Sequence, residues 1–103
     1  MDDYGSGYFM IRPGAREFLA QMSQYYEVVI WTAALQEYAD WVLDHLVPNN
    51  SGPIISSRLY RQHAVPDLPV YLKDLSLLGR PLERVIIVDN VAQNFKRQPE
   101  NGI

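Results

Sequence analysis

The chain has 103 residues, 48% of them hydrophobic and 20% charged, and 12 acidic residues against 9 basic ones give a formal net charge of −3. This is the size and composition of one globular domain with one core, and unlike a disordered chain. The charge gives no electrostatic reason to expect direct nucleic-acid or anionic-membrane binding, the lack of cysteine excludes disulfides and thiolate metal sites, and no apolar run reaches the ~18–20 residues of a membrane-spanning helix.

The first half of the chain alternates between strand and helix patterns. A short strand is predicted over 8–11, "YFMI". Pro13 suits the first turn of a helix, and apolar residues at helical spacing follow it as far as "SQYY". The β-branched run 27–32, "EVVIWT", predicts a buried parallel strand. Apolar residues then repeat at helical spacing over 35–46, which predicts a second helix.

The second half is less regular. Turn residues fill 47–53, and candidate short strands follow at 54–60 and 70–73. The segment "GRPLE" predicts a turn into a strand over 85–88, "VIIV", and no closing helix is expected after it. Strands and helices in this order are typical of an open α/β sheet with mostly parallel strands.

Polar residues follow three of the predicted strands, at the carboxyl ends where ligands bind in such sheets. Thr32 follows "EVVIW" and Lys73 follows "VYL". Asp89 and Asn90 follow "VIIV". Carboxylate and amide oxygens suit Mg²⁺, which takes one or two protein oxygens and fills its other positions with phosphate and water. The sequence therefore predicts Asp89 and Asn90 as metal ligands.

The other two positions suit a phosphate group. Lys73 offers a point charge to a phosphate oxygen. The hydroxyl of Thr32, ahead of a predicted helix and followed by the free N–H groups of Ala33 and Ala34, forms an anion-binding arrangement. Taken together, these residues predict a magnesium-assisted phosphate site.

Each residue taken singly has a plainer interpretation. Thr32 suits the N-cap of the following helix. Lys73 suits the solvated surface, where most lysines lie. Asp89 and Asn90 are common turn formers. Their occurrence together at strand ends is what favours a joint site.

Six successive segments carry a resemblance to a known family: "RPGAREFL", "YYEVVIWTAALQEYADWVLDHL", "RLYRQH", "YLKDLSLLGR", "RVIIVDN" and "QPENGI". They resemble the NLI-interacting-factor-like phosphatases of the haloacid dehalogenase superfamily, whose best-known members act on the C-terminal domain of RNA polymerase II. The resemblance covers about residues 8–103. It implies a haloacid dehalogenase-like (Rossmann-like), three-layer α/β fold with a mostly parallel central sheet, of which residues 1–103 form a single partial domain, incomplete at both ends.

The resemblance also implies a reaction, a cofactor and roles for the residues above. The reaction is Mg²⁺-dependent phosphoryl transfer from phosphoserine or phosphothreonine, through an aspartyl-phosphate formed on a DxDx(T/V) motif. Thr32, with the neighbouring Ala33, matches the hydroxyl residue that holds a phosphate oxygen. Lys73 matches the lysine that steadies phosphate and nucleophile. Asn90 matches the position that reaches Mg²⁺, and Asp89 supports it as a catalytic and metal-site residue.

One departure from the family pattern bears on activity. The triplet Asp-x-Asp occurs nowhere in the 103 residues. We expect the chain to start after this motif and to end before the last strand and helix of the family, as a fragment or as a segment held by other chains. The chain alone is then expected not to hydrolyse phosphoesters, and protein partners are expected to complete its sheet.

Two non-catalytic alternatives stay open, so whether the protein is an enzyme is undecided. One branch of the family is the presequence receptor subunit of the mitochondrial inner-membrane translocase, which uses the fold as a binding module. The other alternative is an inactive scaffold in a larger assembly. The presence of Thr32 and of the pair Asp89 and Asn90 favours phosphatase ancestry, with a phosphorylated protein such as RNA polymerase II as partner. Nucleus or cytoplasm is the favoured location and the mitochondrion the alternative.

Overall fold

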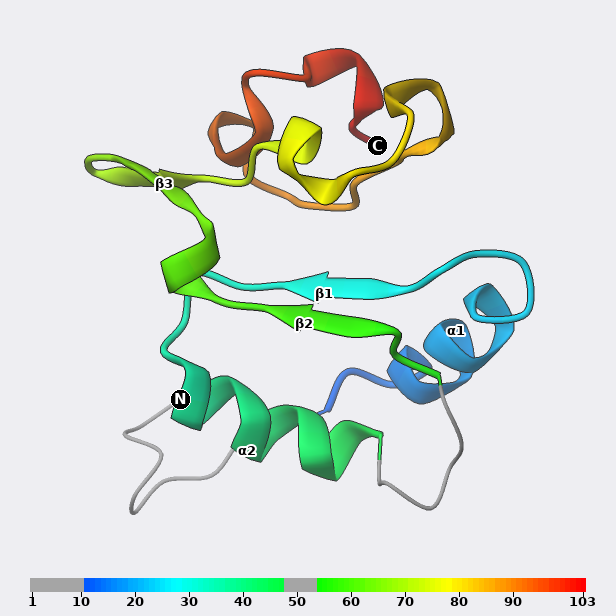
Figure 1. The fold of residues 1–103 in the computed structure, drawn as a ribbon. Coiled ribbons are helices and arrows are strands. Elements are labelled where there is room, and N and C mark those ends of the chain that lie inside the picture. The colour runs from blue at the N-terminus through cyan, green and yellow to red at the C-terminus, as the bar shows by residue number, and fades with distance from the viewer. Residues whose placement is uncertain (1–10, 48–53) are drawn as a thin grey trace. The chain divides into compact units, whose positions relative to one another are not determined.

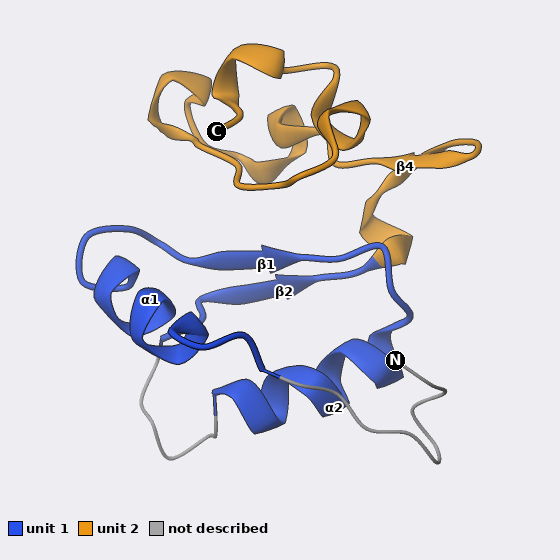
Figure 2. Cartoon of the chain, turned by 180° about the vertical axis from the view of Figure 1, so that it is seen from behind, with its two compact units in different colours: residues 1–60 blue, residues 61–103 orange. Residues whose placement is uncertain are grey.

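The computed structural model describes residues 11–47 and 54–103. The chain divides into two compact units, residues 1–60 (unit 1) and 61–103 (unit 2), shown in different colours in Figure 2. The strand predicted over 8–11 and nearly all of the turn at 47–53 lie outside the described residues. The prediction of a single domain stays a prediction.

Unit 1 contains two helices and a parallel pair of strands (Figure 1). The order is α1 (Ala15–Met22), β1 (Val29–Trp31), α2 (Gln36–Leu46) and β2 (Ser57–Leu59). Val29 of β1 lies opposite Ser57 of β2, and the two strands run in the same direction. These elements confirm the predicted strand–helix alternation, and the parallel pairing agrees with the predicted sheet type.

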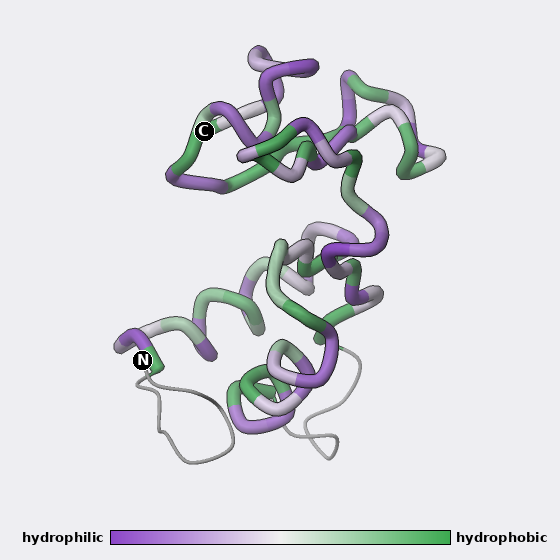
Figure 3. The backbone as a smooth tube through the Cα atoms, turned by 90° about the vertical axis from the view of Figure 1, so that its left-hand side faces the viewer, coloured by the Kyte–Doolittle hydropathy of each residue, from purple (hydrophilic) through white to green (hydrophobic). Residues whose placement is uncertain are grey.

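The helices of unit 1 follow the apolar spacing of the sequence. In α2 the buried residues are Ala39 and Leu43, four positions apart and therefore on one face. Helix α1 begins after Gly14, whose backbone is left-handed with φ of 86°, a conformation that glycine adopts readily. Figure 3 shows hydrophilic and hydrophobic colours alternating along the helical turns, as expected of helices with one apolar side.

Polar side chains tie the elements of unit 1 together. Arg16 of α1 donates from Nε to the carbonyl of Leu46 and from Nη2 to the carbonyl of His45, both at 2.9 Å. These carbonyls belong to the last turn of α2, where backbone acceptors have no partner inside the helix. The Arg16 guanidinium thus caps α2 from another helix.

A second tie joins α2 to the end of β2. Arg58 forms ion pairs with Asp40 and Asp44, both with N···O distances of 3.0 Å, and the hydroxyl of Tyr60 donates to Asp40. The hydrogen bond from Tyr60 and the charge of Arg58 outweigh burial and hold the pKa of Asp40 below its ordinary value. Helix α2 is therefore fixed to the strand pair through its polar side.

Unit 2 is built from a hairpin and short helical turns. The strands β3 (Val65–Asp67) and β4 (Val70–Leu72) pair antiparallel. The 3₁₀ helices are η2 (Arg61–His63), η3 (Leu75–Leu78), η4 (Leu82–Arg84), η5 (Ala92–Phe95) and η6 (Pro99–Asn101). The candidate strand 70–73 is thus confirmed as β4. Strand β4 pairs antiparallel because a tight turn joins it to β3, which lies just before it in the sequence. The sequence analysis did not predict β3.

The core of unit 2 is small and apolar. Leu72 at the end of β4 and Leu75 at the start of η3 are each only 2% exposed, and Phe95 of η5 is buried as well. Gly102 lies so close to the Phe95 ring that a Cβ atom there would overlap it. The buried amide of Asn101 donates to the carbonyls of residues 82 and 85, each at 2.7 Å.

The strand predicted over 85–88 does not form. Ile87 makes a single parallel bridge to Gly102, donating to Asn101 O at 2.9 Å and accepting from Ile103 N at 3.0 Å. The backbone groups of Ile86 and Val88 have no hydrogen-bond partner among the described residues, and the two residues are 55% and 67% exposed. The prediction of a buried strand was wrong, because the single bridge from Ile87 to Gly102 does not extend into a series of paired residues.

Helices long and apolar enough to span a membrane do not occur in the described parts of the chain.

Candidate functional site

The centre of the candidate site is an ion pair between two residues that the sequence analysis singled out. Lys73 Nζ lies 2.8 Å from Asp89 Oδ2. The side chains are only 12% and 8% exposed, so the pair is largely shielded from water. Lys73 follows β4 and Asp89 follows the apolar segment 85–88, as predicted. Unit 2 therefore brings two of the predicted residues into direct contact.

The carboxylate of Asp89 is held by two further donors. Oδ1 accepts from the backbone N–H of Val91 at 2.9 Å, which closes a turn, and Oδ2 accepts from Asn94 Nδ2 at 3.1 Å. Burial alone would raise the pKa of Asp89, but the hydrogen bonds from Lys73, Val91 and Asn94 outweigh it and lower that pKa. Asp89 is therefore an ionised carboxylate in a fixed orientation.

Asn94 is a member of the site that the sequence analysis missed. Its side chain binds Asp89, and its backbone carbonyl accepts from Lys73 N at 2.7 Å. Asn94 thus contacts both partners of the ion pair from η5. The signal available in the sequence was a second amide residue shortly after the Asp-Asn pair. Apolar periodicity does not predict which way the side chain of such a residue points in a short turn.

Asn90 is exposed and lies next to Asp89. Its amide oxygen and the remaining lone pair of Asp89 Oδ1 offer one or two ligand oxygens. That is the number Mg²⁺ takes from protein when phosphate and water fill its other positions. The described residues contain no group of three or more His, Cys, Asp or Glu side chains that could hold a metal ion. Asp89 and Asn90 therefore fit a magnesium site in which the protein supplies one or two oxygen ligands and phosphate and water supply the rest.

Thr32 and Ala33 belong to unit 1, so their meeting with Lys73 stays a prediction. Thr32 N extends the β1–β2 pairing by donating to Leu59 O at 3.0 Å. Its Oγ1 accepts from Ala34 N at 3.0 Å, so that N–H is engaged and not free as predicted. The interpretation of Thr32 as a helix cap was also wrong, because α2 begins at Gln36 and its N-cap is Leu35, three residues after Thr32.

Two features of unit 2 thus agree with a phosphate-handling site: a shielded ammonium group and an oriented carboxylate followed by an exposed amide. Comparison with known proteins decides the family. The family model of the NLI interacting factor-like phosphatases matches residues 2–103. The chain belongs to this family. Membership implies the haloacid dehalogenase superfamily, as the resemblance of the six segments indicated.

Curated relatives of this phosphatase family fall into two groups. Over 92 residues the chain is 47% identical to CTD small phosphatase-like protein 2 of Dictyostelium discoideum, covering 89% of the chain and 16% of the relative. Over 96 residues it is 40% identical to CTD small phosphatase-like protein 3 of Caenorhabditis elegans, covering 93% and 33%. It is also 40% identical over 92 residues to the mitochondrial import inner membrane translocase subunit TIM50 of Candida glabrata, covering 89% and 19%.

The chain spans about a third or less of the length of these three relatives. Sequence similarity of the same order links it to phosphatases and to a translocase subunit. Family membership therefore does not by itself decide between catalysis and binding.

Proposed function

We propose that this chain forms part of a Mg²⁺-dependent protein serine/threonine phosphatase of the CTD-phosphatase type, which works through an aspartyl-phosphate. The proposed substrate is a phosphorylated protein, with the C-terminal domain of RNA polymerase II as the first candidate. The chain contributes the phosphate-binding lysine and the acid and amide of the metal site. It lacks an Asp-x-Asp nucleophile, so we expect no hydrolysis by these 103 residues alone.

The ion pair of Lys73 with Asp89 carries this proposal. The Lys73 side chain is only 12% exposed, so its ammonium group has given up part of its hydration, and the ion pair with Asp89 offsets that loss. Held on a fixed carboxylate, it can present its remaining N–H donors to a phosphate oxygen. Fixed charges of this kind are the main protein contribution to phosphoryl transfer.

The other residues have roles that follow from their groups. Asp89 keeps the Lys73 ammonium in place, and Asn94 orients Asp89. Asn90 and Asp89 would hold Mg²⁺, which supplies positive charge against the phosphate oxygens when bound. Thr32, with the backbone of Ala33, would add a hydroxyl or N–H donor to the same phosphate.

A non-catalytic binding module is the second candidate. It is supported by the 40% identity to the TIM50 subunit of Candida glabrata. In such a protein the Lys73–Asp89 pair would serve the fold alone. An inactive scaffold would leave the pair in the same role.

Phosphate binding by the chain tests the proposal. We expect inorganic phosphate with Mg²⁺ to shift the NMR signals of Lys73 and Asn90 in a saturable way. Lys73→Met should weaken phosphate binding at least about tenfold, because one charge-assisted hydrogen bond is lost. The matched control is Lys96→Met, since Lys96 is the second of the two lysines and pairs with Asp67 at the surface.

Two results would contradict the proposal: phosphate causing no saturable shift, or Lys96→Met weakening binding as much as Lys73→Met. In the full-length protein, Lys73→Ala should also reduce phosphate release from a phosphoserine peptide by roughly 10²–10³-fold. Unchanged release would favour the binding module.

A further inference from the structure

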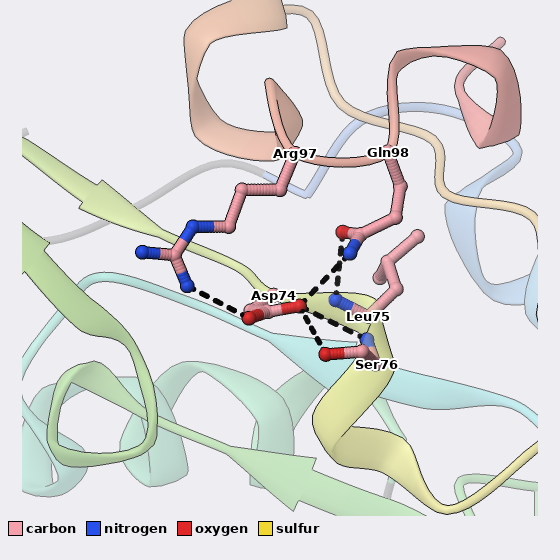
Figure 4. Close-up of polar contacts among 5 residues, drawn as sticks. All are labelled: Asp74, Leu75, Ser76, Arg97 and Gln98. Atoms are coloured by element: carbon pink, nitrogen blue, oxygen red, sulfur yellow. Dashed lines mark hydrogen bonds and ion pairs between the residues drawn. The ribbon is translucent and has the colours of Figure 1, made fainter.

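A second group of polar contacts adjoins the candidate site and is centred on Asp74. This carboxylate is buried, with 7% of the residue exposed. Oδ1 accepts from Ser76 N (3.1 Å), Ser76 Oγ (2.7 Å) and Gln98 Nε2 (2.9 Å), and Oδ2 accepts from Arg97 Nη1 (2.9 Å) (Figure 4). The buried Gln98 also accepts at Oε1 from Leu75 N at 3.0 Å. We call these five residues the Asp74 cluster.

The cluster contains contacts of two kinds. The bonds from Ser76 are local and make Asp74 the N-cap of η3. The bonds from Arg97 and Gln98 come from 23 and 24 positions away in the sequence. A cap needs only the local bonds, so the distant ones require another explanation.

The distant bonds join the segment that carries Lys73 to the segment that carries Asn94. Leu75 and Asp74 are tied to Gln98, as described above. Lys73 N donates to Asn94 O at 2.7 Å in the same join. Lys73 and Asn94 are also two of the residues that hold the Asp89 carboxylate. The Asp74 cluster therefore holds together the two segments whose residues Lys73 and Asn94 bind the Asp89 carboxylate.

We propose that Asp74 and Gln98 are positioning residues that act through Lys73, holding its backbone so that its ammonium stays on Asp89 and faces phosphate. The phosphate part of this role rests on the function proposed above. A lysine stem has four flexible carbons, so the site of its charge depends on where its backbone is anchored. Asp74 and Gln98 anchor that backbone on the residue directly after Lys73.

The charge of Asp74 is also kept away from Lys73. Hydrogen bonds from Ser76 and Gln98 outweigh burial and, with Arg97, hold the pKa of Asp74 far below its ordinary value. The carboxylate is therefore ionised, and both of its oxygens are already bound to these donors. Lys73 therefore pairs with Asp89 and not with Asp74, the acid that directly follows it in the sequence.

Competitive acetylation of the full chain tests the positioning. The chain has two lysines, Lys73 and Lys96, and trace acetic anhydride followed by mass spectrometry gives their relative rates. We expect Lys73 to react about tenfold more slowly than Lys96, because it is buried and paired whereas Lys96 is half exposed. Gln98→Met keeps the side-chain length and removes the two bonds that the Gln98 amide makes, to Asp74 and to Leu75 N, and should raise the Lys73 to Lys96 ratio roughly threefold or more.

Two further variants guard the result against simple misfolding. Arg97→Met removes one distant bond at a half-exposed position and should raise the ratio in the same direction, by less. Ser76→Ala removes a donor to the same carboxylate but no distant bond, and should leave the ratio unchanged. Because Lys96 is already half exposed, general unfolding would also raise the ratio, toward one. The result for Gln98→Met therefore counts only if hydrogen exchange of the unit 2 amides outside the Asp74 cluster stays as in the natural chain.

The proposal is overturned if Gln98→Met and Arg97→Met leave the ratio as it is in the natural chain, or if Ser76→Ala raises it equally. The acetylation experiment contains no phosphate, so its failure is distinct from failure of the proposed function. Loss of phosphate binding in Lys73→Met tests that function separately.

Discussion

The two units of this chain are held together in different ways. The described part of unit 1 contains two α-helices, of 8 and 11 residues, and a parallel strand pair. The strands of both units have three residues each, but the helical elements of unit 2 are 3₁₀ turns of only three or four residues. Side chains such as Asp74, Gln98 and Asn101 there bind backbone or side chains many positions away.

The difference between the two units shows which parts of a fold a local sequence pattern can predict. A helix of unit 1 is encoded by spacing within about 11–18 residues, which periodicity detects. The order of unit 2 depends on pairs such as Asp74 with Gln98, 24 positions apart. The candidate ion pair lies in the second kind of region, so its geometry depends on a few polar contacts.

The largest effect should come from the core of unit 2. Leu75→Ala removes a side chain that is 2% exposed and should lower the free energy of unfolding by about 2–5 kcal/mol. Hydrogen exchange of the unit 2 amides measures the loss. The matched control is Leu77→Ala in the same η3, 64% exposed, which should stay within about 0.5 kcal/mol. Equal effects at the two positions would refute this description of the core.

A smaller effect should follow acidification. The pKa of Asp74 is lowered in the folded state from its ordinary value of 3.8, so between the folded pKa and 3.8 the folded state binds fewer protons than the unfolded one. Its contribution to stability is therefore present above pH 3.8 and is lost as pH falls toward the lower folded pKa. Asp74→Asn should flatten the acid loss of unit 2 measured by hydrogen exchange. Asp67→Asn, in an exposed pair with Lys96, should flatten it less, and the reverse order would contradict the assignment.

The smallest effect should appear in unit 1, where Arg16 makes one of the side-chain contacts that join residues far apart in the sequence. Arg16→Met keeps an apolar stem and removes two bonds to the last turn of α2, at a cost of about 0.5–1.5 kcal/mol. Both tryptophans, Trp31 and Trp41, belong to unit 1, so tryptophan fluorescence during chemical unfolding follows this unit. The control is Arg12→Met, another exposed arginine, and a loss there equal to that of Arg16→Met would contradict the capping role.

The fold could be predicted from the sequence where the apolar face of one helix, or one run of β-branched residues, determines the element. Helix α2 follows from apolar spacing, and strand β1 follows from a β-branched run. Strand β3 was missed because Val65–Asp67 has only one strongly apolar residue and pairs through its turn with β4. The strand at 85–88 was predicted wrongly, since composition shows that a segment can be a strand but not whether a partner lies beside it.

The candidate site could be predicted in part for the same reason. Lys73 and Asp89 stand out as polar residues after apolar runs, and the structure brings them together. Asn94 and Gln98 have no such context, because an amide in a short turn is ordinary until its partner is known. The roles of Thr32 and Asn90 in phosphate and metal binding remain predictions for the titration described above.

The half-paired segment around Ile87 also affects how the protein behaves in solution. Ile86 and Val88 are exposed apolar residues whose backbone groups have no partner among residues 11–47 and 54–103, so they can pair with an extended chain. Pairing between two copies is a bimolecular event, so its rate rises with the square of concentration while folding does not. We therefore expect dilution to keep the protein monodisperse and crowding at high concentration to favour aggregation, starting from this one short edge.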